Sequence, residues 1–444
     1  MKLRLEGSLI KTFTSLELNE NILKAIEELE YKEPTEIQQK AIPLALKKRD
    51  ILAAAQSGTG KTAAFLLPIL EDLLEQKQKN ELAILRALIL VPTRELATQI
   101  SKAIEDYAKY MNVEKLAVFG GVSSTEQMRK LSKGVDILVS TSGRLMEHLR
   151  NKSVDLSSVS TVVIDEVDTM LAMGFLEDIE KILPNVGPHR QIMMFSATMN
   201  QNVKKLAKEF LQDPVVIEVA SQRSSVKIIE QQIVLVDLDK KAELLSYLIG
   251  SRNYSQVLVF VNMKKEADDL VTHLNLDGLP AECIHGDVRQ TARAKALRKF
   301  KSGDIRVLVA TDIAARGIDI ELLPVVVNFA LPETIADYTH RIGRTGRAGN
   351  AGTAITLLSV KDYKFMIEIE KELILNIPRI EVEGFETTEK KPRLFKARPK
   401  PLSQKKAEAK KATQKSEFTK TNTPKKSSKK KKTTKRDQNR SFRK

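Results

Sequence analysis

The stretch 55–62 has the residue types and spacing that bind nucleotide phosphates. It lies between an apolar run, 51–54, and a helical pattern that begins at 63, which is the strand–loop–helix order of a P-loop. Backbone N–H groups of such a loop point at an anion, which the positive end of the helix also attracts. Lys61 would reach the β- and γ-phosphates, and the Thr62 hydroxyl would ligate Mg²⁺. The loop residues are Ala55, Gln56, Ser57, Gly58, Thr59, Gly60, Lys61 and Thr62.

A pair of carboxylates ends the apolar run 162–164. Asp165, at the end of this expected strand, is the partner that a P-loop needs to complete a Mg²⁺ site with Thr62. Glu166 beside it is suited to orient or deprotonate a water molecule for attack on the γ-phosphate. Together with the P-loop, the pair indicates nucleoside triphosphate hydrolysis.

Hydrolysis also needs positive charge near the γ-phosphate, and the stretch 338–347 supplies it. Arg341, Arg344 and Arg347 lie within seven residues there. Arginines that reach a nucleotide from a second domain act as arginine fingers, typically worth roughly 10³–10⁵ in rate. In that arrangement, ATP would close a cleft between the domains and its loss would open the cleft.

Each of these features has a purely structural alternative. The loop could be an ordinary strand-to-helix turn, since Ala55 stands where a P-loop usually has its first glycine. The two acids could cap a helix, and the arginines could form a salt-bridge cluster. The occurrence of Gly-Lys-Thr, the acid pair and the arginines in one chain favours the catalytic interpretation.

Alternating apolar runs and helical patterns place these groups on parallel sheets. Such runs, separated by helices, predict buried parallel strands with right-handed crossovers, and ligands bind beyond the carboxyl ends of those strands. The first series of expected strands after 51–54 is 87–91, 116–119, 136–140, 161–165, 192–195 and 215–219. The second series is 232–236, 257–261, 282–284, 307–310, 325–329 and 353–358.

The predicted fold class is therefore α/β, with two domains in tandem. We expect an N-terminal domain over 1–220, a polar linker at 221–226 and a second domain over 227–375. A helical pattern runs through 362–373, and 377–379 marks the approximate end of the ordered chain. An extension, 376–389, and a Lys-rich tail, 390–444, complete the predicted organisation.

The tail holds all the excess positive charge. Residues 390–444 carry 23 Lys and Arg against three acids, a net of +20, so 1–389 carry −4 of the chain's total of +16. Because the tail has almost no large apolar residues, it is expected to be disordered. We interpret it as an arm for a polyanion, with RNA favoured. A merely solubilising tail and attraction to an anionic membrane surface are the alternatives.

Composition limits the location and the kinds of site. No apolar run approaches the ~18 residues that span a bilayer, and no secretory signal is apparent at the start. The one cysteine, Cys283, excludes an intramolecular disulfide and a cysteine-rich zinc site. We therefore expect a cytoplasmic protein that does not bind membranes and acts as a monomer. His148, His189 and His273 are expected to be surface or helix residues.

The order of motifs resembles that of the DEAD-box ATP-dependent RNA helicases. The matching motifs are AQSGTGKT, PTREL, GG, TSGR, DEVD, SAT, HGD, ATDIAARGID and HRIGRTGR, within about residues 13–373. The resemblance implies two RecA-like domains that use ATP and Mg²⁺ for local, non-processive unwinding of RNA duplexes or remodelling of RNA–protein complexes. The ending 377–386 and the basic tail are similar to the bacterial RhlE-like subgroup. Ribosomal precursors or an RNA-decay complex are the implied partners.

The resemblance also implies roles for individual residues. The adenine-reading segment would be 13–39. Phe13 would stack on the base, and Gln38 would form hydrogen bonds with it, because its amide can both donate and accept. Lys61, Asp165, Glu166, Arg344 and Arg347 would be catalytic, and Gly317 and Asp319 would help to bind the nucleotide. Asp168, Ser196, Thr198 and His340 would couple hydrolysis to domain closure. RNA would be bound by Pro92, Thr93, Arg94, Gly121, Thr141, Arg144, Asn262, Gly286, Gln290, Arg293 and Thr311.

Three residues depart from the family pattern. Val167 replaces an alanine, Ser142 replaces a proline, and Glu30 stands where glycine usually precedes Tyr31. None of them removes a catalytic group, so we expect an active enzyme whose coupling these changes could alter. Two other functions compete with this one. They are a non-hydrolysing RNA-binding or annealing protein that acts through its tail, and a DNA-unwinding relative.

Overall fold

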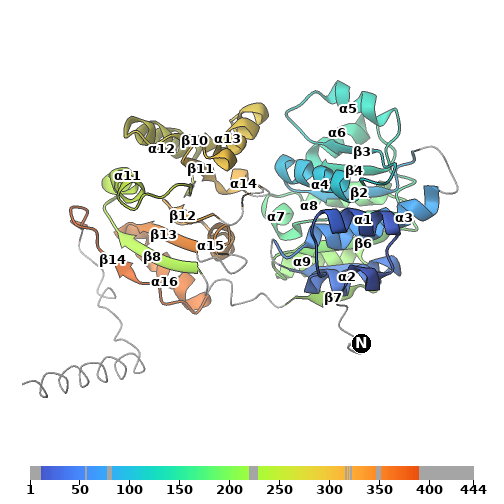
Figure 1. Ribbon diagram of the computed structural model, residues 1–444, viewed down its shortest axis with the longest axis horizontal. Coiled ribbons are helices and arrows are strands. Elements are labelled where there is room, and N and C mark those ends of the chain that lie inside the picture. The colour runs from blue at the N-terminus through green and yellow to red at the C-terminus, as the bar shows by residue number, and fades with distance from the viewer. Residues whose placement is uncertain are drawn as a thin grey trace, which may run out of the picture. The chain divides into compact units, whose positions relative to one another are not determined.

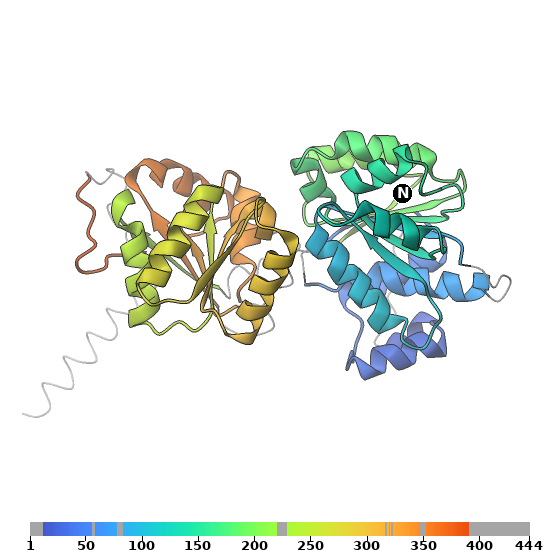
Figure 2. The ribbon, with the colours of Figure 1, turned by 90° about the horizontal axis from the view of Figure 1, so that it is seen from above.

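The computed structural model describes residues 12–55, 58–77, 83–219, 229–315, 318, 320, 323–346 and 352–389. Two parallel sheets organise these residues, each flanked by its own helices (Figures 1 and 2). The first seven strands pair only with one another, and so do the last seven. The α/β class and the parallel sheets predicted from the sequence are thereby confirmed.

The first sheet has seven parallel strands in the order β3-β4-β2-β5-β6-β1-β7. Its strands are β1 (Ile51–Ala54), β2 (Ala87–Val91), β3 (Lys115–Val118), β4 (Ile137–Thr141), β5 (Thr161–Ile164), β6 (Gln191–Ser196) and β7 (Val215–Glu218). The helices are α1 (Glu20–Glu28), α2 (Glu36–Leu46), α3 (Lys61–Lys77), α4 (Arg94–Tyr107), α5 (Ser124–Leu131), α6 (Ser142–Arg150), α7 (Val167–Ala172), α8 (Leu176–Ile182) and α9 (Gln201–Phe210), with 3₁₀ turns at Phe13–Leu16 and Leu183–Asn185. In this sheet, the predicted and observed strand ends differ by one residue at most.

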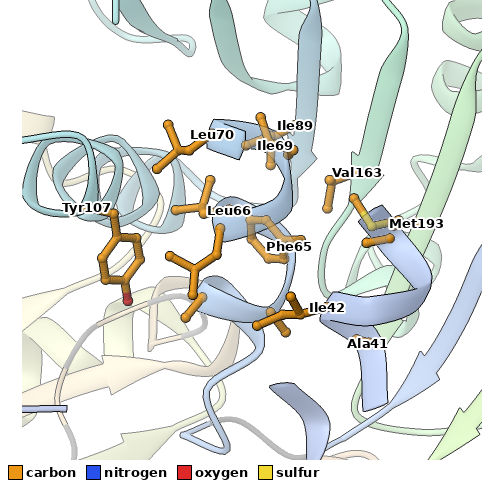
Figure 3. Packing of buried hydrophobic residues seen from close by; sticks show 14 of the residues in the cluster. Ala41, Ile42, Phe65, Leu66, Ile69, Leu70, Ile89, Tyr107, Val163 and Met193 are labelled. Atoms are coloured by element: carbon orange, nitrogen blue, oxygen red, sulfur yellow. The ribbon is translucent and has the colours of Figure 1, made fainter. Parts of the chain in front are cut away.

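Both faces of this sheet are buried, which explains why its strands read as continuous apolar runs. In β2, Ile89 points into one core, whereas Leu88 and Leu90 point into the core on the opposite face. Figure 3 shows the first of these cores, where Phe65 and Leu66 of α3 meet Ile42 of α2. The Phe65 ring lies 5.3 Å from that of Phe195, centroid to centroid. This packing fixes α3, and hence the loop before it, on the sheet.

The second sheet also has seven parallel strands, in the order β10-β11-β9-β12-β13-β8-β14. Its strands are β8 (Ile229–Leu235), β9 (Val257–Val261), β10 (Ala281–Ile284), β11 (Val307–Thr311), β12 (Val325–Asn328), β13 (Gly352–Leu358) and β14 (Arg379–Ile380). The helices are α11 (Lys241–Ser251), α12 (Lys264–Leu276), α13 (Gln290–Ser302), α14 (Asp312–Ala315), α15 (Ile335–Ile342) and α16 (Tyr363–Glu372), with 3₁₀ turns at Leu238–Lys240 and Val360–Asp362. None of the helices in the described part of the chain is long and apolar enough to cross a membrane.

The segment after α16 continues the second domain, contrary to the expectation that order ends near 377–379. Its residues 379–380 form β14, which pairs with β8 at the edge of the sheet. Phe385 packs into the core beside the ring of Tyr247, at a centroid distance of 5.5 Å. Asp237 accepts hydrogen bonds from both the backbone N–H (2.9 Å) and the hydroxyl (2.7 Å) of Thr388. A two-residue strand carries no periodic pattern, which is why the sequence does not predict it.

The end of α1 gives a physical reason for the family glycine that this chain lacks. Glu30 has a φ of 58°, in the left-handed region. The Tyr31 N–H donates to the Ile26 carbonyl (3.2 Å) and the Glu30 N–H to that of Glu27 (2.9 Å), the bond pair of a Schellman motif. Glycine adopts this conformation without a steric cost, whereas glutamate does not.

Candidate functional site

The phosphate loop leaves the carboxyl end of β1 and leads into α3. Its first residue extends the sheet, because the Ala55 N–H donates to the Ser196 carbonyl of β6 (2.9 Å). Ala55 is buried and is not among the described residues with positive φ. The position therefore accepts a side chain, and the departure from the usual glycine does not distort the loop. Gly58 and Gly60, by contrast, have φ values of 76° and 91° that favour glycine.

Lys61 lies at the start of α3 with its ammonium group buried. Its side-chain nitrogen has no hydrogen-bond partner among the residues that the structure describes. A buried ammonium without a partner is costly, and a nucleotide phosphate would supply one. The Asp165 and Glu166 carboxyls lie close enough for the Lys61 charge to favour their ionised forms. These residues therefore fit a phosphate together with a divalent cation.

The two carboxylates follow β5 directly, as predicted. The Glu166 N–H donates to the Asp165 carboxylate (2.9 Å), and Glu166 itself has a left-handed φ of 51°. Strain of this kind concentrates at functional sites. Burial raises the pKa of both carboxyls, and the nearby Lys61 ammonium opposes that rise. A raised pKa suits a group that must accept a proton near neutral pH.

Gln38 connects the segment predicted to read adenine to the phosphate loop. Its side-chain oxygen accepts from the Thr35 N–H (2.9 Å), within a capping box at the start of α2. Its side-chain nitrogen donates to the Gly60 carbonyl (3.1 Å). A Cβ at Gly60 would lie 2.4 Å from that nitrogen, so the contact needs a glycine. One N–H and one lone pair of the Gln38 amide stay available for a base.

Phe13 lies in the same cleft, where it is buried beside the Tyr31 ring at a centroid distance of 6.4 Å. Tyr31 also forms an edge contact with Tyr107 of α4, at 6.2 Å. The cleft is lined by Phe13, Tyr31, Gln38, Gly58, Gly60, Lys61, Thr62, Asp165 and Glu166, among others. The structure thus gathers the described residues predicted for base, phosphate and metal.

The residues predicted to couple hydrolysis to closure form a hydrogen-bonded link in the first domain. Asp168 of α7 accepts from the backbone N–H (3.0 Å) and the hydroxyl (2.9 Å) of Thr198. The Ser196 hydroxyl donates to the Thr198 carbonyl (2.7 Å). His340 lies on α15 of the second domain, and its role in coupling stays a prediction.

The residues predicted to contact RNA in the first domain lie at the end of β4 or in the segments that follow β2, β3 and β4. The left-handed Gly121 (φ 82°) packs against Arg94, whose guanidinium occupies the space that a Cβ would need. Arg144 donates to the Val122 carbonyl (3.2 Å) and to the Gln127 side-chain oxygen (3.2 Å). Thr93 and Thr141 are the N-cap residues of α4 and α6, and Pro92 precedes Thr93. Two guanidinium groups therefore border one glycine loop.

A buried network beside this loop is not apparent from the sequence pattern. His148 is buried, and its two ring nitrogens contact the Ser153 hydroxyl (2.7 Å) and the Gln127 oxygen (3.1 Å). Gln127 also donates to the Phe119 carbonyl (3.1 Å), next to the glycine loop. Burial, followed by the charge of Arg144, lowers the pKa of His148. His148 lies on α6, which agrees with the expectation of a surface or helix residue, and the structure adds that its side chain is buried.

In the second domain, Arg341 forms a salt bridge, which was the structural alternative to a catalytic role for the arginines. It is buried, pairs through two bonds of 2.6 Å with Asp312, and donates to the Asn262 side-chain oxygen (2.9 Å). Asn262 in turn donates to the Leu331 carbonyl (2.8 Å). Arg344 instead donates to the Ile318 carbonyl (3.1 Å), and its charge favours ionised Glu166. Arg341 therefore holds the second domain together, whereas the charge of Arg344 acts on Glu166.

The remaining predicted RNA contacts lie at or after strand ends of the second domain. Gly286 follows β10, Gln290 begins α13, and Thr311 ends β11. Gln290 donates to the Glu95 carboxylate (3.2 Å), which also pairs with Arg293 (2.9 Å). Some predicted residues lie outside the described part of the chain: Gln56, Ser57, Gly317, Asp319, Arg347, the linker 221–226 and the tail 390–444.

Comparison with family models covers both domains. A model of the DEAD/DEAH box helicases matches residues 35–206. A model of the helicase conserved C-terminal domain matches residues 239–349. The two matches divide the chain as the two sheets do.

Similar proteins agree with these matches. The DEAD-box ATP-dependent RNA helicase CshA of Geobacillus kaustophilus is 42% identical over 360 residues, which are 81% of this chain and 76% of the relative. CshA of Bacillus subtilis is 41% identical over 360 residues, 81% of this chain and 72% of the relative. These relatives carry the name CshA, so they support the family but not the narrower RhlE-like subgroup.

Solved structures extend the similarity to the fold. Saccharomyces cerevisiae Dbp5 L327V bound to RNA and ADP BeF₃ has a TM-score of 0.77 at 29% identity, over 84% of this chain and 97% of that one. Mss116p bound to ssRNA and AMP-PNP has a TM-score of 0.76 at 28% identity, over 85% of this chain and 80% of that one. The two sheets are therefore RecA-like domains. The chain belongs to the DEAD-box ATP-dependent RNA helicases, which are RNA-dependent ATPases.

Proposed function

We propose that this helicase binds ATP and RNA cooperatively and couples hydrolysis to local, non-processive separation of short RNA duplexes. The observation that carries this proposal is the buried Lys61 ammonium, which lacks a hydrogen-bond partner among the described residues and faces two carboxylates. Such a group needs an anion. The phosphates of ATP would supply this anion, with adenine toward Phe13 and Gln38.

In the proposed reaction, Glu166 accepts a proton from the attacking water molecule. The water oxygen bonds to the γ-phosphorus as the bond to the β,γ-bridging oxygen breaks, which yields ADP, phosphate and a proton. Lys61, Arg344 and Arg347 stabilise the charge that develops on the phosphoryl oxygens. Thr62 and Asp165, the latter through water, would hold Mg²⁺, which neutralises phosphate charge when it is bound.

RNA is proposed to bind through its backbone. Arg94 and Arg144 supply guanidinium groups for phosphates, and Gly121 allows close approach of the chain. The full set proposed for RNA is Pro92, Thr93, Arg94, Gly121, Thr141, Arg144, Asn262, Gly286, Gln290, Arg293 and Thr311. Because backbone contacts carry little sequence information, we expect a sequence-tolerant substrate.

The tail is proposed to add sequence-independent affinity for RNA. Its net charge of +20 over 390–444 would release counterions on binding, which makes affinity fall steeply with salt. Deleting 390–444 should weaken RNA binding and flatten its salt dependence, with basal ATPase unchanged. An unchanged salt slope in the truncated protein would count against this role.

We propose that the helicase acts as a cytoplasmic monomer on ribosomal precursors or in RNA decay. The CshA-like similarity over both domains supports a bacterial RNA helicase of this general kind. Crosslinking in cells would identify the bound RNAs, and recovery of neither ribosomal precursors nor messenger fragments would contradict this setting.

The deciding experiment for the mechanism compares ATPase rates with and without single-stranded RNA. Wild-type protein should show RNA-stimulated hydrolysis, and Glu166→Gln should be slower by roughly 10²–10⁴, the usual contribution of a general base. Exposed Glu177, on α8, gives a matched control, because Glu177→Gln should leave the rate unchanged. Equal background rates in wild type and Glu166→Gln would refute the assignment. Single-stranded DNA at matched salt tests whether RNA is preferred.

A further inference from the structure

Three different metal-ligating side chains meet at the edge of the second sheet, apart from the residues assigned to ATP. Cys283 lies on the edge strand β10, His285 follows that strand, and Asp268 lies on α12. Figure 1 shows α12 and β10 as neighbours, and the two elements are in contact. The thiol, a ring nitrogen and a carboxylate oxygen all lie within 4.8 Å of one another.

Strand geometry explains why two of these groups converge. Side chains at i and i+2 of an extended segment point to the same side, so Cys283 and His285 both face the helix. The Asp268 oxygen Oδ1 lies 3.0 Å from Nε2 of His285 and 3.3 Å from Sγ of Cys283. One carboxylate oxygen thus accepts hydrogen bonds from the Cys283 thiol and from the His285 ring. A cation placed among the three groups would replace the two protons in these bonds.

The distances fit a tetrahedral ion with little rearrangement. Zinc binds sulfur at about 2.3 Å and nitrogen or oxygen at about 2.0–2.2 Å, so its ligands lie roughly 3.3–3.7 Å apart. The two separations from the Asp268 oxygen, 3.0 and 3.3 Å, lie at or just below the lower end of that range, and the sulfur and the ring nitrogen lie within 4.8 Å of each other. His285 is buried, Cys283 is half-buried and the Asp268 side chain is 58% exposed, which leaves an entry path and room for water as a fourth ligand.

We propose that Asp268, Cys283 and His285 form a binding site for a zinc-like divalent cation. On binding, the Cys283 thiol loses its proton to solvent and a metal–sulfur bond forms, while His285 binds through Nε2 and carries its proton on Nδ1. Nδ1 is buried without a hydrogen-bond partner among the described residues. Loss of such an orienting contact typically lowers metal affinity about 10–100-fold. The site is therefore weaker than a closed structural zinc site.

The site lies next to a residue that is proposed to contact RNA. His285 immediately precedes Gly286, in the segment that connects β10 to α13. An ion would tie the start of this segment to α12. That link adds to the ion pair between Lys264 and Asp287 (2.6 Å), which already joins α12 to the same segment.

The test uses the full-length protein and Co²⁺ as a spectroscopic probe, with a phosphine reductant and without ATP or RNA. Co²⁺ bound to a thiolate gives a near-ultraviolet charge-transfer band, and Cys283 is the only cysteine in the chain. We expect one equivalent of Co²⁺ to produce the band and Zn²⁺ to abolish it. No band in the wild type at saturating Co²⁺ would overturn the proposal.

Variants separate this site from unspecific binding. Cys283→Ser should lose the band, and Asp268→Asn should weaken Co²⁺ binding at least about tenfold. The His273–Asp277 pair at the C-terminal end of the same helix (3.3 Å) offers a matched control, so Asp277→Asn should bind Co²⁺ like the wild type. Equal affinities of Asp268→Asn and wild type would exclude Asp268. Protection of the wild-type thiol from alkylation by Zn²⁺ provides a readout that needs no variant, and failure of Zn²⁺ to protect it would contradict the site.

Discussion

Thr198 donates both its backbone N–H (3.0 Å) and its hydroxyl (2.9 Å) to the same carboxylate oxygen of Asp168. This pair joins the loop after β6 to the start of α7, directly beyond the acid pair of β5. A change at the start of α7 can therefore reach the Ser-Ala-Thr loop through two hydrogen bonds. The link lies within the first domain.

Removal of the Thr198 hydroxyl should uncouple unwinding from hydrolysis. Thr198→Val keeps the shape of the side chain but loses one charge-assisted bond to Asp168, worth about 1.5–3 kcal/mol. We expect RNA-stimulated ATPase within a few-fold of wild type and duplex unwinding at least about tenfold slower. Thr272→Val is the control, because among the described residues the Thr272 hydroxyl donates only to the carbonyl of Asp268 in its own helix (2.9 Å). Parallel losses of ATPase and unwinding in Thr198→Val would contradict a coupling role.

Glu166→Gln should stabilise the nucleotide-free protein while it slows ATP hydrolysis. Burial raises the pKa of Glu166, so ionisation above its ordinary value of 4.5 costs folding free energy that a neutral glutamine does not cost. We expect a gain of roughly 0.5–2 kcal/mol near neutral pH, typical where function opposes stability. Thermal melts from pH 7 downward should show that the gain shrinks as wild-type Glu166 becomes protonated.

A substitution at an exposed glutamate is the control for these thermal melts. Glu177→Gln removes a carboxylate whose side chain is 79% exposed, so its effect should stay within about 0.5 kcal/mol at every pH. A stability gain in Glu166→Gln that does not change with pH would assign the effect to packing rather than to ionisation.

The sequence predicts the sheets and the position of the candidate catalytic residues because both depend on local signals. Uninterrupted apolar runs such as 87–91 indicate strands with two buried faces, and Ile89 and Leu90 indeed enter opposite cores. Lys61 and the acid pair lie where strand ends predict them, since the carboxyl ends of parallel strands share one edge.

Features that depend on contacts between distant residues are not predictable in the same way. The Gln127–His148 bond joins α5 to α6, and nothing in either local pattern marks the two side chains as buried. The partner of Gln38 in the phosphate loop is a backbone carbonyl, that of Gly60, which no side-chain motif specifies. β14 is too short to show a period, and its place follows from Phe385 and Thr388 farther along the chain.

A glycine at position 30 should stabilise the protein. The left-handed φ of Glu30 costs about 1–2 kcal/mol for a residue with a Cβ, and the added freedom of glycine in the unfolded chain offsets about 0.4–1 kcal/mol of that. Glu30→Gly should therefore add roughly 0.5–1 kcal/mol to the free energy of unfolding by urea denaturation. Glu27→Gly, also exposed but inside α1, should instead lose about 1 kcal/mol. Equal effects of the two substitutions would contradict the conformational explanation.

Asp237 should determine whether the segment 376–389 stays on the second domain. Hydrogen bonds from the hydroxyl of Thr387 and from the backbone and hydroxyl of Thr388 lower the pKa of Asp237 to about 2. Because this folded-state pKa lies below the ordinary value of 3.8, the contribution to stability is complete above the ordinary value and is lost as the pH falls toward 2. Asp237→Asn removes the negative charge at all pH values.

Hydrogen exchange read out by mass spectrometry checks this anchor. In Asp237→Asn, amides of 376–389 should exchange roughly tenfold faster at neutral pH, since charge-assisted bonds are about twice as strong as neutral ones. Asp239→Asn, at an exposed position two residues away, should leave the exchange unchanged. If Asp237→Asn preserves the protection of 376–389, then β14 and Phe385 alone hold the segment, and the carboxylate has no anchoring role.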